Sequence, residues 1–187
     1  MPPARLCALA LVACLGLAGA ARAQALPAGL VDQRGAAFPE GALAGRLRLL
    51  YFGYTHCPDL CPTTLDTLSW ALDLLPPPAA ERVAPVLVAA DPARDTAPVL
   101  REYLASFHPR IVGVTGPVAA IDDLAWSLGA LIVRHPDGGA AGYTVDHTTD
   151  LFLIRPEGGR PERVPHGTDA EALAVRIRAA LGEAGMR

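Results

Sequence analysis

Two cysteines four positions apart are the residues of this sequence most able to do chemistry. Cys57 and Cys61 lie in the stretch YFGYTHCPDLCPTTL, residues 51–65, where an apolar run gives way to a predicted helix. A disulfide between them would close a very short loop and stabilise the fold by only about 2 kcal/mol. A structural cross-link is therefore the weakest interpretation, and a redox pair or two metal ligands remain. The spacing leaves both open, although redox pairs are more often one residue closer.

The predicted helix would place its N-terminus beside both sulfurs. Unpaired N–H groups and the helix dipole stabilise a thiolate there, and a thiolate is both a nucleophile and a soft metal ligand. Two thiolates would leave a Cu(I) or zinc site short of ligands, so a metal site requires a third donor.

The histidines are the candidates for that third donor. His147 stands out because it lies in YTVDHTTDLFLI, directly before an apolar segment that reads as a buried strand. The other four are predicted to serve elsewhere: His56 pointing away from the thiols, His108 as a helix C-terminal cap, His135 in an exposed turn and His166 in a loop without a partner.

Apolar runs alternate with segments of helical periodicity along the chain. The runs predict strands at 47–54, 83–90, 111–114, 131–134 and 151–155, the last two as a hairpin-like pair. The periodic segments predict four helices. The first begins near Pro62 and ends at Pro76-Pro77-Pro78, the second is capped by Asp95 or Thr96, the third begins at Val118, and the last is capped by Thr168 or Asp169. Residues 24–46 predict an irregular segment with a short hairpin, and residues 135–142 a Gly-rich turn.

This alternation predicts an α/β protein with a thioredoxin-like fold, a central mixed sheet carrying helices on both faces. Such folds hold a thiol pair where the first of these strands leads into a helix. The loop that enters strand 151–155 would then face the thiols. Thioredoxin-type enzymes have a proline there, whereas this chain has Asp146-His147-Thr148.

The N-terminus predicts export. An arginine, the uncharged apolar stretch 6–21 and the A-x-A pattern at 21–23 indicate a signal peptide over residues 1–23, followed by one domain at 24–187. A membrane anchor, or a lipoprotein leader acylated at Cys14, are the alternatives. Cleavage would remove Arg5 and Arg22 and no acid, changing the net charge from −3 to −5. No basic stripe indicates nucleic-acid binding.

Three stretches together resemble the signature segments of the Sco/SenC family: YFGYTHCPDLCPTTL, DPARDT at 91–96 and VDHTTDLFLI at 145–154. The resemblance runs from about Val31 to about Leu181. It implies a copper-binding protein of thioredoxin-like fold, with Cys57, Cys61 and His147 as ligands of Cu(I) or Cu(II). It also implies a position near the site for Asp91, which otherwise reads as the start of an Asp-Pro turn.

The function implied by the resemblance is that of a metallochaperone in the bacterial periplasm, free or attached to the inner membrane through its N-terminus. It would receive copper from an upstream donor and deliver it to the copper-bearing subunit of cytochrome c oxidase, at the binuclear copper site. This is not an enzyme activity. The alternative is a thiol–disulfide oxidoreductase or redox sensor acting through Cys57 and Cys61. The histidine in place of the proline of thioredoxin-type enzymes argues against a general oxidoreductase.

Overall fold

The computed structural model describes residues 26–136 and 143–183, so the predicted leader at 1–23 lies outside the described residues. The first half contains β1 (Val31–Asp32), a 3-10 helix η1 (Glu40–Leu43), β2 (Leu47–Gly53), α1 (Leu60–Asp73), α2 (Pro77–Glu81), β3 (Val83–Ala89) and α3 (Ala97–Leu104). The second half contains β4 (Val112–Thr115), α4 (Val118–Ser127), β5 (Ile132–His135), β6 (Thr144–His147), β7 (Leu151–Ile154), β8 (Glu162–Val164) and α5 (Ala170–Ala180).

Six of the strands form one mixed sheet in the order β1-β4-β3-β2-β7-β8, and β5 and β6 pair in a separate two-stranded sheet. In the larger sheet, β2 runs parallel to β3 and antiparallel to β7. Every residue of β2 is buried, because the strand is covered on both faces; this explains why it is apolar apart from Arg48.

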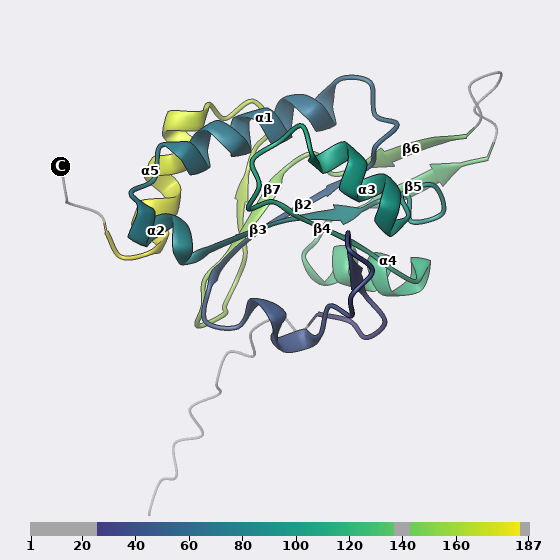
Figure 1. Ribbon diagram of the computed structural model, residues 1–187, viewed down its shortest axis with the longest axis horizontal. Helices are drawn as coiled ribbons and strands as arrows, with labels where there is room; N and C mark the ends of the chain where they lie inside the picture. Colours follow the sequence, from purple (N-terminus) through teal and green to yellow (C-terminus); the bar gives the residue numbers. More distant parts are fainter. Residues whose placement is uncertain (1–25, 137–142, 184–187) are drawn as a thin grey trace, which may run out of the picture.

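Helices cover both faces of this sheet (Figure 1). Leu49 and Tyr51 of β2 pack in the cluster that holds the apolar faces of α1, α3 and α5. Leu50 and Phe52 point the other way, into the cluster formed with α4 and the apolar side chains of residues 26–43. The structure therefore has the predicted thioredoxin-like α/β arrangement.

The start of α1 differs from the prediction. The helix begins at Leu60, so Cys61 lies within its first turn and Pro62 is its third residue rather than its first. Proline is tolerated there because the first N–H groups of a helix have no partner within it. Pro76 ends the segment as predicted, but Pro77 then opens the short helix α2.

The strands after β4 also differ from the prediction. β6 and β8 were not predicted, and the expected pairing of segments 131–134 and 151–155 is wrong: β5 pairs with β6, and β7 with β8. His147 is consequently the last residue of a strand and not a loop residue. This strand has a weak sequence signal, since Thr144–His147 is four residues long with only Val145 buried.

One of the two predicted N-terminal helix caps is confirmed. The Asp169 side chain accepts a hydrogen bond from the Ala172 N–H at 2.7 Å and caps α5. The cap assigned to Asp95 or Thr96 is wrong in its chemistry, since Thr96 occupies the N-cap of α3 without a side-chain hydrogen bond. The Asp95 carboxylate instead accepts from Thr55, 40 residues away.

Candidate metal centre

The fold brings the three predicted metal-ligating residues together. Cys57 comes from the loop between β2 and α1, Cys61 from the first turn of α1, and His147 from the end of β6. One potential ligand atom from each lies within 4.8 Å of the others. Across residues 26–136 and 143–183, no other group of His, Cys, Asp or Glu side chains meets this condition.

The N-terminus of α1 lies against the sulfur of Cys57. The Cys61 backbone N–H donates a hydrogen bond to Cys57 Sγ at 3.4 Å. This donor belongs to the first turn of the helix, where the N–H groups lack intrahelical partners and the helix dipole is positive. Cys57 is half-buried and both thiols are free, so Cys57 is the sulfur that a metal or a partner thiol would meet first.

Cys61 is the buried sulfur of the pair, with no solvent exposure. Burial raises the pKa of its thiol to about 12, because the apolar surroundings disfavour the thiolate. At neutral pH the free protein therefore holds a proton on Cys61. A metal ion that binds this sulfur must displace that proton, so metal binding and proton release are coupled here.

His147 presents one ring nitrogen to the thiols. Its Nε2 lies 3.4 Å from Cys61 Sγ, and its Nδ1 lies 3.1 Å from the Thr148 carbonyl oxygen. A carbonyl can only accept, so Nδ1 carries the hydrogen and the Nε2 lone pair faces the sulfur. Burial lowers the pKa of the imidazole below its ordinary value, which keeps the ring neutral and able to ligate.

Two tyrosines hold the His147 ring. Tyr51 and Tyr54 contact it edge to face, with centroid separations of 5.9 and 5.7 Å. These edge-to-face contacts restrict the plane of the imidazole as it approaches Cys61. The sequence predicts both tyrosines only as members of the strand at 47–54.

Gly53 is a further residue of the site that sequence reasoning missed. A Cβ at this position would lie 2.8 Å from Tyr51 Cε1, 3.0 Å from Leu87 Cδ1 and 3.3 Å from Cys61 Sγ. Only glycine leaves room for the sulfur and the tyrosine ring together. The available signal was a glycine at the end of an apolar strand, which often marks such a close approach.

The site opens to solvent through a surface hollow of about 420 Å³. Cys57 and His147 line it together with Tyr54, Pro58, Asp59, Leu60, Val145, Asp146 and Thr149. The carboxylates of Asp59 and Asp146 make its rim negative, which favours the approach of a cation. The hollow also leaves one side of the three-atom cluster accessible to an added ligand.

The remaining histidines lie outside the cluster. His56 is exposed and contacts Thr55. His135 is exposed as predicted, but it is the last residue of β5 and not part of a turn, and it pairs with Asp146 at 2.8 Å. The prediction that His108 caps a helix is wrong: α3 ends at Leu104, and His108 Nδ1 accepts from the Arg110 N–H.

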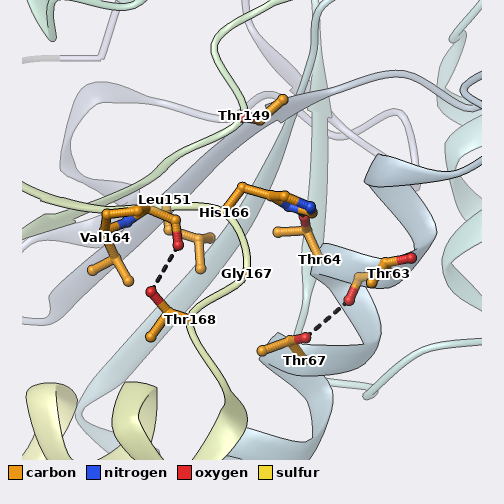
Figure 2. A pocket seen from close by; sticks show the side chains of 10 residues that line it. Thr63, Thr64, Thr67, Thr149, Leu151, Val164, His166, Gly167 and Thr168 are labelled. Carbon is orange, nitrogen blue, oxygen red and sulfur yellow. Dashed lines mark hydrogen bonds between the residues drawn. The ribbon is translucent and has the colours of Figure 1, made fainter.

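His166, expected to have no partner, also has one. Its Nδ1 lies 3.1 Å from Thr64 Oγ1. Figure 2 shows the two side chains meeting in a small pocket between α1 and the loop that precedes α5, lined mainly by threonines. Because Thr64 also bonds the Leu60 carbonyl oxygen at 2.8 Å, this histidine supports the first turn of α1.

Asp91 does not touch the three clustered residues. Its backbone oxygen accepts from the N–H groups of Arg94 and Asp95, which is the predicted turn. Its carboxylate is fully buried and accepts from Arg94 Nε and from the Tyr143 hydroxyl. A side chain without exposure does not present itself to a partner, so the structure does not place Asp91 at a docking surface.

The donor set has a clear chemical preference. Two sulfurs and one imidazole form a compact group that suits Cu(I), Cu(II) or zinc far better than the hard cations Mg²⁺ and Ca²⁺. Joining the same two sulfurs in a disulfide would remove two donors at once. Metal binding and thiol oxidation therefore compete for the same atoms.

Within residues 26–136 and 143–183, none of the helices is long and apolar enough to cross a bilayer.

Comparison with known proteins places this chain among one group of relatives. The SCO1/SenC family model matches residues 22–182. The mitochondrial protein SCO2 of Saccharomyces cerevisiae is 35% identical over 153 residues, which are 81% of this chain and 51% of the yeast protein. The chain thus spans about half the length of that relative.

Two solved structures share the fold. ScoI of Bradyrhizobium japonicum, with copper bound, aligns at a TM-score of 0.74 and 32% identity, covering 83% of this chain and 98% of that protein. Yeast Sco1 with copper bound aligns at a TM-score of 0.76 and 31% identity, covering 86% and 89%.

Proposed function

This chain belongs to the SCO1/SenC family, and on that premise we propose that it is a copper metallochaperone that delivers copper to the binuclear copper site of cytochrome c oxidase. Copper is its cargo. Cys57, Cys61 and His147 are its ligands, and the recipient is the copper-bearing subunit of the oxidase.

One observation carries the proposal. Three donors of matching softness from three separate segments meet within 4.8 Å, with the imidazole lone pair aimed at the buried sulfur. A purely redox pair would have no need of that imidazole. The copper-bound structures of two relatives give the metal its identity by analogy.

The accessible side of the site suits a carrier better than a store. A fourth donor from a partner could enter through the hollow, and copper would then leave by stepwise exchange of ligands. The S₂N set is soft enough for Cu(I) and retains an imidazole for Cu(II), so we propose that both oxidation states bind. An upstream protein would load the site by the same exchange.

The proposed location is the bacterial periplasm, with residues 1–23 as the export signal and residues 24–187 as the functional domain. The leader pattern and the half-buried Cys57 thiol beside a second thiol support this location, since thiol–disulfide chemistry belongs to oxidising compartments. Attachment to the inner membrane through an uncleaved or acylated N-terminus is the variant of this proposal. Fractionation of cells that express either the full chain or the chain without residues 1–23 distinguishes a free periplasmic protein from a membrane-attached one.

The test is a competitive titration of the reduced domain from Gln24 onward with Cu(I) and a colorimetric chelator. The wild-type protein should bind one equivalent, and His147→Ala should bind it much more weakly. His108→Ala is the matched control, because His108 lies near Asp73 at the opposite end of α1. Failure of the reduced wild-type protein to compete for Cu(I) would refute the copper function.

A second candidate is a thiol–disulfide oxidoreductase. The pairing of a half-buried Cys57, bonded by a helix N–H, with a buried Cys61 favours it. In that reaction the two thiols would become a disulfide while a partner disulfide becomes two thiols. Rapid reduction of insulin that survives the His147→Ala substitution would favour this candidate over the first.

A further inference from the structure

His147 is not held against the thiols by the main sheet. It ends β6, which pairs with β5 in a sheet of two strands, and no ladder hydrogen bond within the described residues joins that sheet to the six-stranded one. Figure 1 shows β5 and β6 extending away from the other strands. Apolar packing of Val145 and Ile132 holds the pair in place, but such packing is non-directional and does not set a distance to within tenths of an ångström.

The six residues that follow β3, Ala90–Asp95, contact both ligand-bearing segments. On the thiol side, Asp95 is fully buried and accepts from the Thr55 hydroxyl at 2.6 Å and from the Thr55 N–H at 3.2 Å. Thr55 lies two residues before Cys57. The Ala90 N–H also donates to the Gly53 carbonyl oxygen at 2.8 Å, so the chain leading to the thiols is tied at two points.

On the imidazole side, the same segment holds both strands of the small sheet. The Tyr143 hydroxyl donates to Asp91 Oδ1, and Arg94 donates to Asp91 Oδ2 and, at 3.3 Å, to the Tyr143 carbonyl oxygen. Tyr143 lies four residues before His147. From the neighbouring strand, Arg134 donates twice to the Ala90 carbonyl oxygen, at 2.8 and 3.1 Å.

The Arg94 guanidinium extends this link towards the imidazole. Its carbon lies 3.9 Å from the centroid of the Tyr143 ring and 6.0 Å from that of Tyr54, and Tyr54 contacts His147 edge to face. The contacts with Asp91 are charge-assisted and buried, so they are directional and strong.

We propose that residues 90–95 form a clamp that sets the position of His147 relative to Cys57 and Cys61. Asp91 and Arg94 are then positioning residues, which act on the imidazole through Tyr143 and never touch the metal. Asp95 has the same role towards the thiols through Thr55. This proposal rests on the copper site proposed above and gives the stretch DPARDT a physical role.

The decisive variant is Tyr143→Phe, which removes one hydroxyl from Asp91 and keeps the ring under Arg94. Its matched control is Tyr103→Phe, because the Tyr103 hydroxyl is buried without a hydrogen-bond partner among the described residues. Cu(I) affinity should fall about tenfold in Tyr143→Phe, the size expected for a lost charge-assisted hydrogen bond. Equal affinities in the two variants would overturn the clamp.

Combining the variants with His147→Ala separates positioning from general stabilisation. If Tyr143 acts through His147, then Tyr143→Phe should cause no further loss of affinity in the His147→Ala protein. Thr55→Val, which acts through the thiols, should weaken binding about equally with and without His147. The same tenfold loss for Tyr143→Phe in both backgrounds would mean a general structural role and would refute the proposal.

Hydrogen exchange in the metal-free protein tests the clamp independently of copper. Tyr143→Phe should speed exchange of the β6 amides at Thr144–His147 at least several-fold and leave those of β2 unchanged. Absence of copper binding in the wild-type protein would defeat the proposed function, whereas unchanged exchange in β6 would defeat the clamp itself.

Discussion

Acidification should weaken Cu(I) binding at least tenfold between pH 7.5 and pH 6.5. Burial raises the pKa of Cys61 to about 12, so the free protein keeps this proton throughout that range. The copper-bound sulfur has lost it. One proton released on binding changes the affinity by a factor of ten per pH unit, which is about 1.4 kcal/mol.

His147 adds to this slope only at lower pH. Because burial lowers the pKa of the imidazole below 6.5, the ring is already neutral at pH 7.5 and competes with the metal for a proton only as the pH approaches that lowered value. The dependence should therefore steepen on the acid side. His147→Ala should remove the extra steepness and leave the contribution of Cys61.

The assay is a competitive titration against a Cu(I) chelator whose own pH dependence has been calibrated. Wild type, Cys61→Ser and the control His108→Ala are compared at several pH values from 7.5 to 5.5. Cys61→Ser should bind more weakly and lose about one power of ten per pH unit from its slope. A wild-type affinity that stays constant between pH 7.5 and 6.5 would show that Cys61 is not a ligand and would refute the reasoning.

Three further predictions concern the same site. Gly53→Ala should lower the free energy of unfolding by about 1–3 kcal/mol and weaken copper binding, because the added Cβ displaces the Cys61 sulfur or the neighbouring Tyr51 ring. Denaturant unfolding measures the loss of stability. The control variant is Gly41→Ala, where an added Cβ meets nothing within 4 Å. Mild oxidation should join Cys57 to Cys61 and abolish copper binding until a reductant is added, as thiol counting and titration would show. The metal-free protein should become less stable as the pH falls below about 6.5, because the unfolded chain protonates His147 before the folded one does. Denaturant unfolding between pH 7.5 and 5.5 measures this, and the free energy of unfolding of His147→Gln should fall less than that of the wild type. Parallel falls of the two free energies would contradict the prediction.

Much of the architecture could be predicted from the sequence because it depends on local pattern. The mostly apolar run of β2 requires cover on both sides, and the leucines of α1 repeat at helical spacing on its buried face. The pairing of the later strands could not be predicted. The segment Thr144–His147 is too short and too polar for its sequence to predict a strand, and it forms one because β5 pairs with it.

The functional site, like the fold, could be predicted only in part from the sequence. The sequence by itself determined that two thiols stand between a strand and a helix N-terminus, since four residues of spacing and the end of an apolar run are local facts. Only the tertiary structure decided that His147, 86 residues from Cys61, turns its Nε2 towards that sulfur, that Cys61 is buried, and that Asp95 binds Thr55 instead of capping a helix. Local periodicity specifies which side chains face inward, whereas contacts between distant segments depend on how the strands are ordered in space.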